Sequence, residues 1–339
     1  LYAPTRRDRT SMLLSRHATP APDSLTDAST PPVSAAQGDV PETPLPAAPP
    51  RLWARVAQRL AGVFAPHHAA RQGLLQLDEA SAFAGCPRGI EGCPEHRETL
   101  SLRGRRVQMV SWGDPRRQPY VLLPPLDATG RDAMAAWVRA LTAQGFAVVA
   151  FAREGRTVAT QTSTLLETAG DMLEVGRRCG EAAAVIGHSL GAMSVVLALH
   201  QGLRAKQAIL VSAQADPRAA LHRFVDRAGM GPRVGARMLA LLESRIGQGL
   251  DGLQAHRIAP AIGIPVLVVH DLLDDEVPWD EGERFARHLT AARLLTTLDL
   301  GHHGVLNDPT VLRDCLRFLK GEAIGDKVVS SPNLPYGVT

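Results

Sequence analysis

Gly187-His188-Ser189-Leu190-Gly191 places a serine between two glycines at a point where the sequence changes character. An apolar run over residues 182–186 precedes it and has the composition of a buried strand. A helix-compatible run over residues 192–199 follows it directly. A strand–turn–helix of this kind holds its serine at a strained apex with the hydroxyl exposed, and small flanking residues avoid a clash. Ser189 is therefore the candidate nucleophile.

Strand and helix patterns alternate along the chain from about residue 99 onward. Residues 99–102 and 107–112 predict a hairpin that turns at residues 103–105. Buried strands are expected at residues 120–123, 147–151, 208–211, 265–270 and 294–297, with helical patterns that include residues 164–179, 281–289 and 311–320. We expect an α/β fold with a mostly parallel central sheet, helices on both faces and right-handed crossovers.

Residues 213–263 interrupt this alternation with at least two helices, one marked by Leu221, Phe224 and Val225 and the other by residues 238–242. An insertion above the carboxyl ends of the strands predicts a lid over a pocket, because ligands bind at that edge of such sheets. The alternative is a helical addition that only covers the sheet edge.

The flanking segments differ in composition from this region. Residues 1–50 are rich in proline and alanine and are expected to form a disordered tail. Residues 51–94 predict an N-terminal helix and a connecting segment. The main domain, with the alternating strands and helices, is expected at 95–320 and a C-terminal tail at 321–339. The helix at 51–64 is basic and amphipathic. We favour its docking on the main domain over peripheral contact with a membrane surface.

Composition narrows the function classes. The 339 residues are 45% hydrophobic and carry a net charge of only +3. The basic residues are scattered along the chain, which argues against nucleic-acid binding. The four cysteines have neither zinc-finger nor disulfide-framework spacing, and Cys86 and Cys93 are expected as free thiols, with a small disulfide loop as the alternative. We expect no metal, because the histidines and aspartates form no cluster with ligand spacing beyond the candidate catalytic residues. We expect no cofactor and a cytoplasmic location, because neither a signal-peptide core nor a run of about 20 apolar residues is present. The sequence leaves the oligomeric state open.

Two later segments offer the partners that a serine nucleophile needs. A serine hydroxyl requires an imidazole to take its proton, and that imidazole requires an anion to orient it and to stabilise its charged form. Residues 270–278 place several acids in the loop after an expected strand, and residues 300–304 place two histidines in the loop after the last expected strand. The order is serine, acid, histidine, which differs from the orders in chymotrypsin-like and subtilisin-like enzymes.

By these residues the chain resembles the α/β-hydrolase superfamily over about residues 95–320, and within it bacterial serine hydrolases of the esterase type with a short helical lid. The family's acid loop commonly reads His-Gly-x-x-Asp-x-x-Val-Pro. Here His270, Asp274, Val277 and Pro278 fall on that pattern, while Asp271 replaces the glycine. The resemblance implies that Asp274 is the acid, with Asp275 next in order and Asp271 and Glu276 behind it.

The same resemblance assigns the base and the oxyanion hole. The family's base follows a glycine in the last loop, which favours His302 over His303, and His188 inside the pentapeptide takes a positioning role. The oxyanion hole would use the backbone N–H groups of Leu190 and of a residue in the loop after the third strand. In that loop Pro124 and Pro125 stand where His-Gly is usual, and proline has no N–H. We therefore assign the second donor to Leu126; a register that places it on Pro125 would remove half of the hole.

These residues predict a serine hydrolase that cleaves a carboxylic ester, or a thioester or amide, of a small or medium apolar acyl substrate through an acyl-enzyme. One alternative is an acyltransferase that uses the same triad. The other is a catalytically weak fold that serves as a binding or partner module.

Overall fold

The computed structural model describes residues 65–80, 86–102, 105–124, 131–153 and 165–328 of the chain. The predicted tail at 1–50, the amphipathic helix at 51–64, Leu126 and the part of the predicted 321–339 tail beyond residue 328 lie outside these residues. No helix in the described part of the chain combines the length and the apolar composition that crossing a membrane requires.

An eight-stranded sheet organises the described residues, in the order β1-β2-β4-β3-β5-β6-β7-β8. The β1–β2 hairpin is antiparallel and joins β4 in antiparallel register, while all other neighbours are parallel. The predicted mostly parallel sheet is therefore confirmed. The strands are β1 (Glu95–Leu102), β2 (Arg105–Trp112), β3 (Tyr120–Leu123), β4 (Ala147–Arg153), β5 (Ala184–His188), β6 (Ala208–Val211), β7 (Val266–Asp271) and β8 (Ala292–Thr297).

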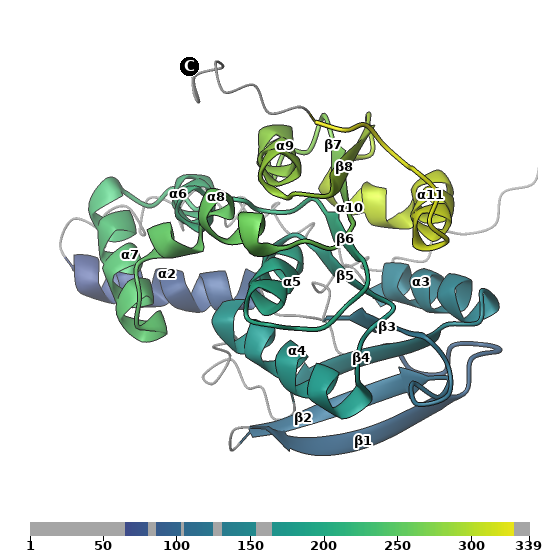
Figure 1. Cartoon of the computed structure of the whole chain (residues 1–339). Coiled ribbons are helices and arrows are strands. Elements are labelled where there is room, and N and C mark those ends of the chain that lie inside the picture. Colours follow the sequence, from purple (N-terminus) through teal and green to yellow (C-terminus); the bar gives the residue numbers. More distant parts are fainter. Residues whose placement is uncertain (1–64, 81–85, 103–104, 125–130, 154–164, 329–339) are drawn as a thin grey trace, which may run out of the picture. The chain divides into compact units, whose positions relative to one another are not determined.

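Helices cover both faces of this sheet, as expected (Figure 1). Successive side chains of a strand point to opposite faces: Val185 joins the apolar cluster on one face, and Ala184 and Ile186 join the cluster on the other. The first face packs against α4 (Leu165–Cys179), α5 (Leu190–His200), α8 (Ala255–Ile258) and α9 (Trp279–His288). The second packs against α3 (Arg131–Ala143), α10 (Gly301–Asn307) and α11 (Pro309–Leu319).

The insertion after β6 contains α6 (Pro217–Arg227) and α7 (Pro232–Ile246) in addition to α8. Asp216 caps α6 by accepting hydrogen bonds from the backbone N–H groups of Arg218 and Ala219, and Pro217 takes the first helical position, where no N–H is needed. Apolar side chains of α6, of α7 and of the link between them pack against α2 (Pro66–Ala80) in a cluster separate from the two sheet faces: Leu221, Val225, Met230, Val234 and Met238. The insertion is thus anchored to a helix that precedes the sheet in sequence.

Several boundaries differ from the predictions. The strand before Ser189 begins at Ala184 and continues through His188, two residues beyond the expected end. The last loop, which the sequence predicts around His302, is instead the short helix α10.

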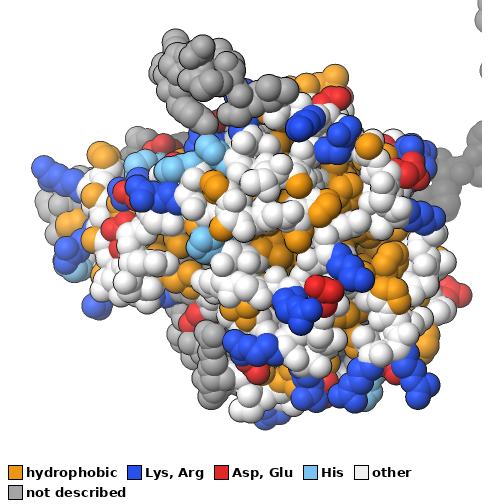
Figure 2. Space-filling model, viewed as in Figure 1, with side chains coloured by type: hydrophobic (Ala, Val, Ile, Leu, Met, Phe, Trp, Pro, Cys, Tyr) orange, Lys and Arg blue, Asp and Glu red, His pale blue; other side chains and the backbone are white. Residues whose placement is uncertain are grey.

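The predicted thiols Cys86 and Cys93 are free. Charged side chains of both signs are spread over the face shown in Figure 2.

Candidate active site

Ser189 occupies the sharp turn between β5 and α5. Its backbone has φ 53° and ψ −121°, a left-handed conformation that costs a non-glycine residue about 1–3 kcal/mol. Gly187 permits the close approach of strand and helix, because a Cβ atom at this position would lie 2.7 Å from Ala192 Cα. The sequence prediction of a strained strand–turn–helix is therefore confirmed in its backbone geometry.

Two other described non-glycine residues have positive φ, Ser212 at 46° and Asp299 at 68°. Ser212 directly follows β6, and Asp299 lies two residues beyond the end of β8. All three strained residues thus stand beyond the carboxyl ends of strands, at the edge of the sheet where ligands bind in such folds.

Asp274 lies in the loop after β7 and is buried. Its Oδ1 accepts hydrogen bonds from the backbone N–H groups of Glu276, at 3.0 Å, and Val277, at 2.8 Å. Its Oδ2 lies 2.8 Å from His302 Nδ1 and 3.5 Å from His270 Nε2. Burial acts to raise the pKa of Asp274, but the hydrogen bonds from His270, His302 and the backbone outweigh it and hold this pKa far below its usual value. Asp274 is thus an ionised acceptor at neutral pH.

The short distance to Asp274 fixes the proton on the His302 ring. An ionised carboxylate only accepts hydrogen bonds, so Nδ1 of His302 carries the hydrogen and Nε2 of the neutral ring keeps a lone pair for an incoming proton. His302 stands in the first turn of α10 and is 4% exposed. The structure therefore brings together the predicted acid and the predicted base.

The other acids of the loop have different partners. Asp271 accepts hydrogen bonds from Thr297 Oγ1, at 2.7 Å, and from Leu300 N, at 3.1 Å, and so ties the two loops together. Glu276 pairs with the neighbouring histidine, His303, at 2.9 Å. Among the described residues Asp274 is the only one of the four candidate acids that bonds His302; the fourth candidate, Asp275, is exposed.

His188, the last residue of β5, contacts both the backbone and the ring of His302. Its Nε2 lies 3.0 Å from the backbone oxygen of His302, and the two ring centroids are 4.6 Å apart. His188, His302 and His303 place one ring nitrogen each within 4.8 Å of one another, a spacing that a metal ion could use. Each ring, however, also bonds to a protein group, namely the His302 backbone, Asp274 and Glu276. These bonds account for the grouping, and we assign no metal to it.

Sequence reasoning missed Gln214. Its Nε2 donates a hydrogen bond to Ser189 Oγ at 3.4 Å, whereas none of the hydrogen bonds between described residues joins Ser189 to His302. Gln214 is half-buried and stands in the segment after β6. The available signal was its position just beyond a parallel strand, beside the strand that carries the serine.

Glu281, on α9, is a second missed residue. Its carboxylate is buried, with a side chain 3% exposed. Oε2 accepts hydrogen bonds from the backbone N–H groups of Ala215, at 2.7 Å, and Asp216, at 2.8 Å, and Oε1 accepts one from Arg223 Nη1 at 2.7 Å. A buried carboxylate with this many donors stabilises the conformation of the segment that follows Gln214.

The expected oxyanion hole is half described. Leu190 is the first residue of α5, and a first-turn N–H has no partner within its own helix. Pro124 is buried at the end of β3, while Pro125 and the predicted donor Leu126 lie outside the described residues. The assignment of Leu126 therefore stays a prediction.

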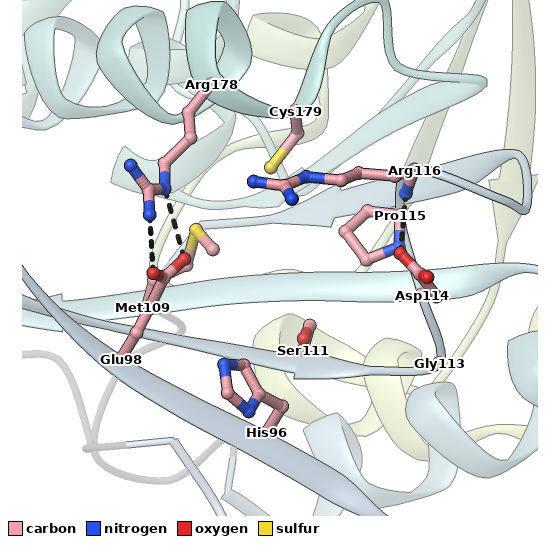
Figure 3. Close-up of a pocket in the computed structure, with 10 residues that line it drawn as sticks. All are labelled: His96, Glu98, Met109, Ser111, Gly113, Asp114, Pro115, Arg116, Arg178 and Cys179. Carbon is pink, nitrogen blue, oxygen red and sulfur yellow. Dashed lines mark hydrogen bonds and ion pairs between the residues drawn. The ribbon is translucent and has the colours of Figure 1, made fainter.

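A separate pocket of about 440 Å³ lies between the β1–β2 hairpin and the end of α4 (Figure 3). Arg178 and Glu98 form a bidentate ion pair across it. Ser111 in this pocket pairs with Val149, near the start of β4, so the pocket lies at the opposite edge of the sheet from Ser189. Its lining residues do not include Ser189, Asp274 or His302.

Comparison with known proteins finds likeness in structure only. No protein-family model and no curated protein sequence matches the chain. Among solved structures, Est1E from Butyrivibrio proteoclasticus is 16% identical, with 67% of this chain and 99% of that one covered and a TM-score of 0.53. A serine hydrolase from Cycloclasticus zankles is 14% identical over 67% and 99%, with a TM-score of 0.50. 2-Hydroxy-6-oxo-6-phenylhexa-2,4-dienoate hydrolase from Rhodococcus sp. strain RHA1 is 15% identical over 68% and 100%, also with 0.50. At these identities the likeness establishes a shared fold.

Proposed function

We propose that this chain, which has the α/β-hydrolase fold, is a serine hydrolase that cleaves carboxylic esters with Ser189 as nucleophile, His302 as base and Asp274 as acid. The observation that carries the proposal is the 2.8 Å bond between His302 Nδ1 and the buried Asp274, together with a serine in a strained turn that directly follows His188, whose Nε2 lies 3.0 Å from the His302 backbone oxygen. Two of the structural neighbours are described as hydrolases, one of them as a serine hydrolase, and they support hydrolase activity in general terms.

Acylation follows from these positions. Ser189 Oγ attacks the ester carbonyl carbon while its proton passes to His302 Nε2, and Asp274 stabilises the imidazolium that forms. The carbonyl oxygen becomes an oxyanion, for which we assign the N–H groups of Leu190 and Leu126 as donors. The C–O bond to the alcohol then breaks, and His302 gives its proton to the departing alkoxide. An acyl-enzyme on Ser189 remains.

Deacylation repeats these steps with water in place of serine. His302 takes a proton from the water as the water attacks the acyl carbon, and the C–Oγ bond breaks as the same proton is delivered to Ser189. Because the pKa of Asp274 lies far below its usual value, the acid stays ionised through both halves of the cycle.

We propose an ester with a small or medium apolar acyl group as the substrate. The large exposed apolar side chains of the described residues are Leu272, Leu273 and Leu298. The first two stand in the acid loop, and the third stands four residues before His302. We also propose that the insertion at 213–263 is the lid. Because its apolar side chains cluster against α2, the case for an apolar substrate rests on the three exposed leucines and not on the insertion.

A catalytically weak binding module is the second candidate. The observation that favours it is the pair Pro124-Pro125, which offers no N–H at the usual position of the second oxyanion donor.

A fluorophosphonate probe, which modifies an activated serine, tests the proposal. We expect labelling of the wild-type protein, loss of labelling in Ser189→Ala and His302→Ala, and labelling retained in the matched control His303→Ala. A set of p-nitrophenyl esters of increasing chain length then measures the acyl preference and separates hydrolysis from transfer when an alcohol acceptor is added. A wild-type protein that neither labels nor turns over any of these esters would favour the binding module.

A further inference from the structure

We propose that Gln214 is a catalytic residue that acts on the serine oxygen and favours release of the acyl group over its capture; this inference rests on the proposed function. The carrying observation is the hydrogen bond from Gln214 Nε2 to Ser189 Oγ at 3.4 Å. A glutamine side-chain nitrogen is always a donor, so the serine oxygen accepts this bond and keeps its own proton available for His302.

The position of β6 in the sheet determines from which side Gln214 approaches Ser189. β6 lies between β5 and β7, so the segment after it stands between the nucleophile and the acid loop. Ser212 donates its N–H to Val269 O at 2.9 Å and then turns through a left-handed conformation with φ 46°. A non-glycine residue persists in that conformation only where its surroundings impose it, and such residues gather at functional sites.

Glu281 acts as a positioning residue for this arrangement. Its buried carboxylate holds the N–H groups of Ala215 and Asp216, the two residues that follow Gln214, and the guanidinium of Arg223 neutralises its charge. Three donors from two segments therefore fix the backbone next to Gln214. The amide of Gln214 therefore reaches Ser189 from a segment whose next two residues are held by Glu281.

The chemistry of the serine oxygen gives this bond its effect. A hydroxyl or alkoxide oxygen is a good acceptor, whereas the same oxygen in an ester is a poor one because its lone pair is delocalised into the carbonyl group. A donor on Oγ thus stabilises free serine relative to the acyl-enzyme. During deacylation the C–Oγ bond breaks, negative charge grows on Oγ, and His302 delivers the proton that came from water; the amide of Gln214 stabilises that charge. During acylation the same amide competes for the attacking lone pair.

Pre-steady-state kinetics with p-nitrophenyl esters tests the inference, because the burst reports acylation and the steady state reports deacylation. In Gln214→Met, which keeps the side-chain volume and removes the donor, we expect the deacylation rate to fall by about three- to tenfold, the effect of losing one neutral hydrogen bond. The rates of acylation and fluorophosphonate labelling are expected to stay the same or to rise. Gln254→Met is the matched control, because the Gln254 amide bonds Asp216, at 3.3 Å, and not the serine.

The result is read from the ratio of the two rates. Equal losses in acylation and deacylation, or no change in either, in a folded Gln214→Met protein would overturn the inference while leaving the proposed function intact. Gln214→Glu is a second variant if the first does not fold: its carboxylate repels charge on Oγ, so the deacylation rate should fall further than in Gln214→Met. A wild-type protein that neither reacts with the fluorophosphonate nor turns over any of these esters would overturn the proposed function itself, and this inference with it.

Discussion

Replacing Asp274 by asparagine removes a charge and reverses one hydrogen bond without changing the shape of the side chain. Oδ1 can keep its bonds to Glu276 N and Val277 N, so the amide nitrogen takes the place of Oδ2 opposite His302 Nδ1. Two donors then face each other at 2.8 Å. The imidazole relieves this contact by moving its hydrogen from Nδ1 to Nε2, and Nε2 can no longer accept the serine proton.

The expected loss has two parts. A hydrogen bond to a charged group contributes about 1.5–3 kcal/mol, or roughly a 10- to 150-fold change in rate where it stabilises the imidazolium. The wrong tautomer adds to this, and together they give an expected fall in kcat of about 10³- to 10⁴-fold. The fold itself should lose only about 1–3 kcal/mol, because one buried donor is left poorly matched.

Ester hydrolysis measures this prediction directly. We expect kcat for a p-nitrophenyl ester to collapse in Asp274→Asn with little change in KM, since the acid does not touch substrate. Asp275→Asn is the matched control: the same change is made one residue away at an exposed position, and activity should stay near the wild-type value. Asp274→Asn with more than a tenth of wild-type activity would refute the assignment of the acid, and a loss in Asp275→Asn would point to its neighbour instead.

The remaining predictions concern stability. Hydrogen bonds lower the pKa of Asp271 and of Asp274 against the opposing effect of burial, so both carboxylates stabilise the fold above the pKa of an unfolded aspartate, about 3.9, and lose that contribution as the pH falls below it. Denaturation by urea at a series of pH values should show this loss between about pH 4 and pH 2, and Asp271→Asn should make the curve flatter. Gly187→Ala should cost about 1–3 kcal/mol in thermal unfolding, because its Cβ would lie 2.7 Å from Ala192 Cα, whereas Gly263→Ala, with no atom within 4 Å of the added carbon, should change little.

The sheet and the two loops of the candidate site could be predicted because their signals are local. Buried parallel strands are short apolar runs, and the two at residues 120–123 and 208–211 have the predicted bounds. Asp274 and His302 each stand just beyond a strand, and neighbouring parallel strands bring such positions to one edge of the sheet. The order of elements along the chain was therefore sufficient to bring the two loops together, whereas the choice of Asp274 and His302 within them came from the resemblance to the α/β-hydrolase superfamily.

The helix α10 and the partners of Glu281 could not be predicted in the same way. α10 is only seven residues long, and its Gly-His-His-Gly start has the composition of a loop, so no helical period was visible. Glu281 bonds Ala215 across 66 residues of sequence, and nothing in the local pattern distinguishes it from the exposed acid beside it, Asp280. Such contacts depend on which helix packs over which loop, which is a property of the folded chain.

Backbone strain links these predictable and unpredictable parts of the site. Ser189, Ser212 and Asp299 each depart from the usual conformations just past a strand end, and each begins a segment that carries a functional candidate: the serine itself, Gln214 or His302. At about 1–3 kcal/mol each, the three together cost an amount comparable to a large part of a domain's net stability. The fold can hold them because buried carboxylates oppose the relaxation: Glu281 fixes the segment after Ser212, and Asp271 bonds Leu300 N beside Asp299. Removing either carboxylate should therefore disturb the geometry around Ser189 while the sheet stays folded.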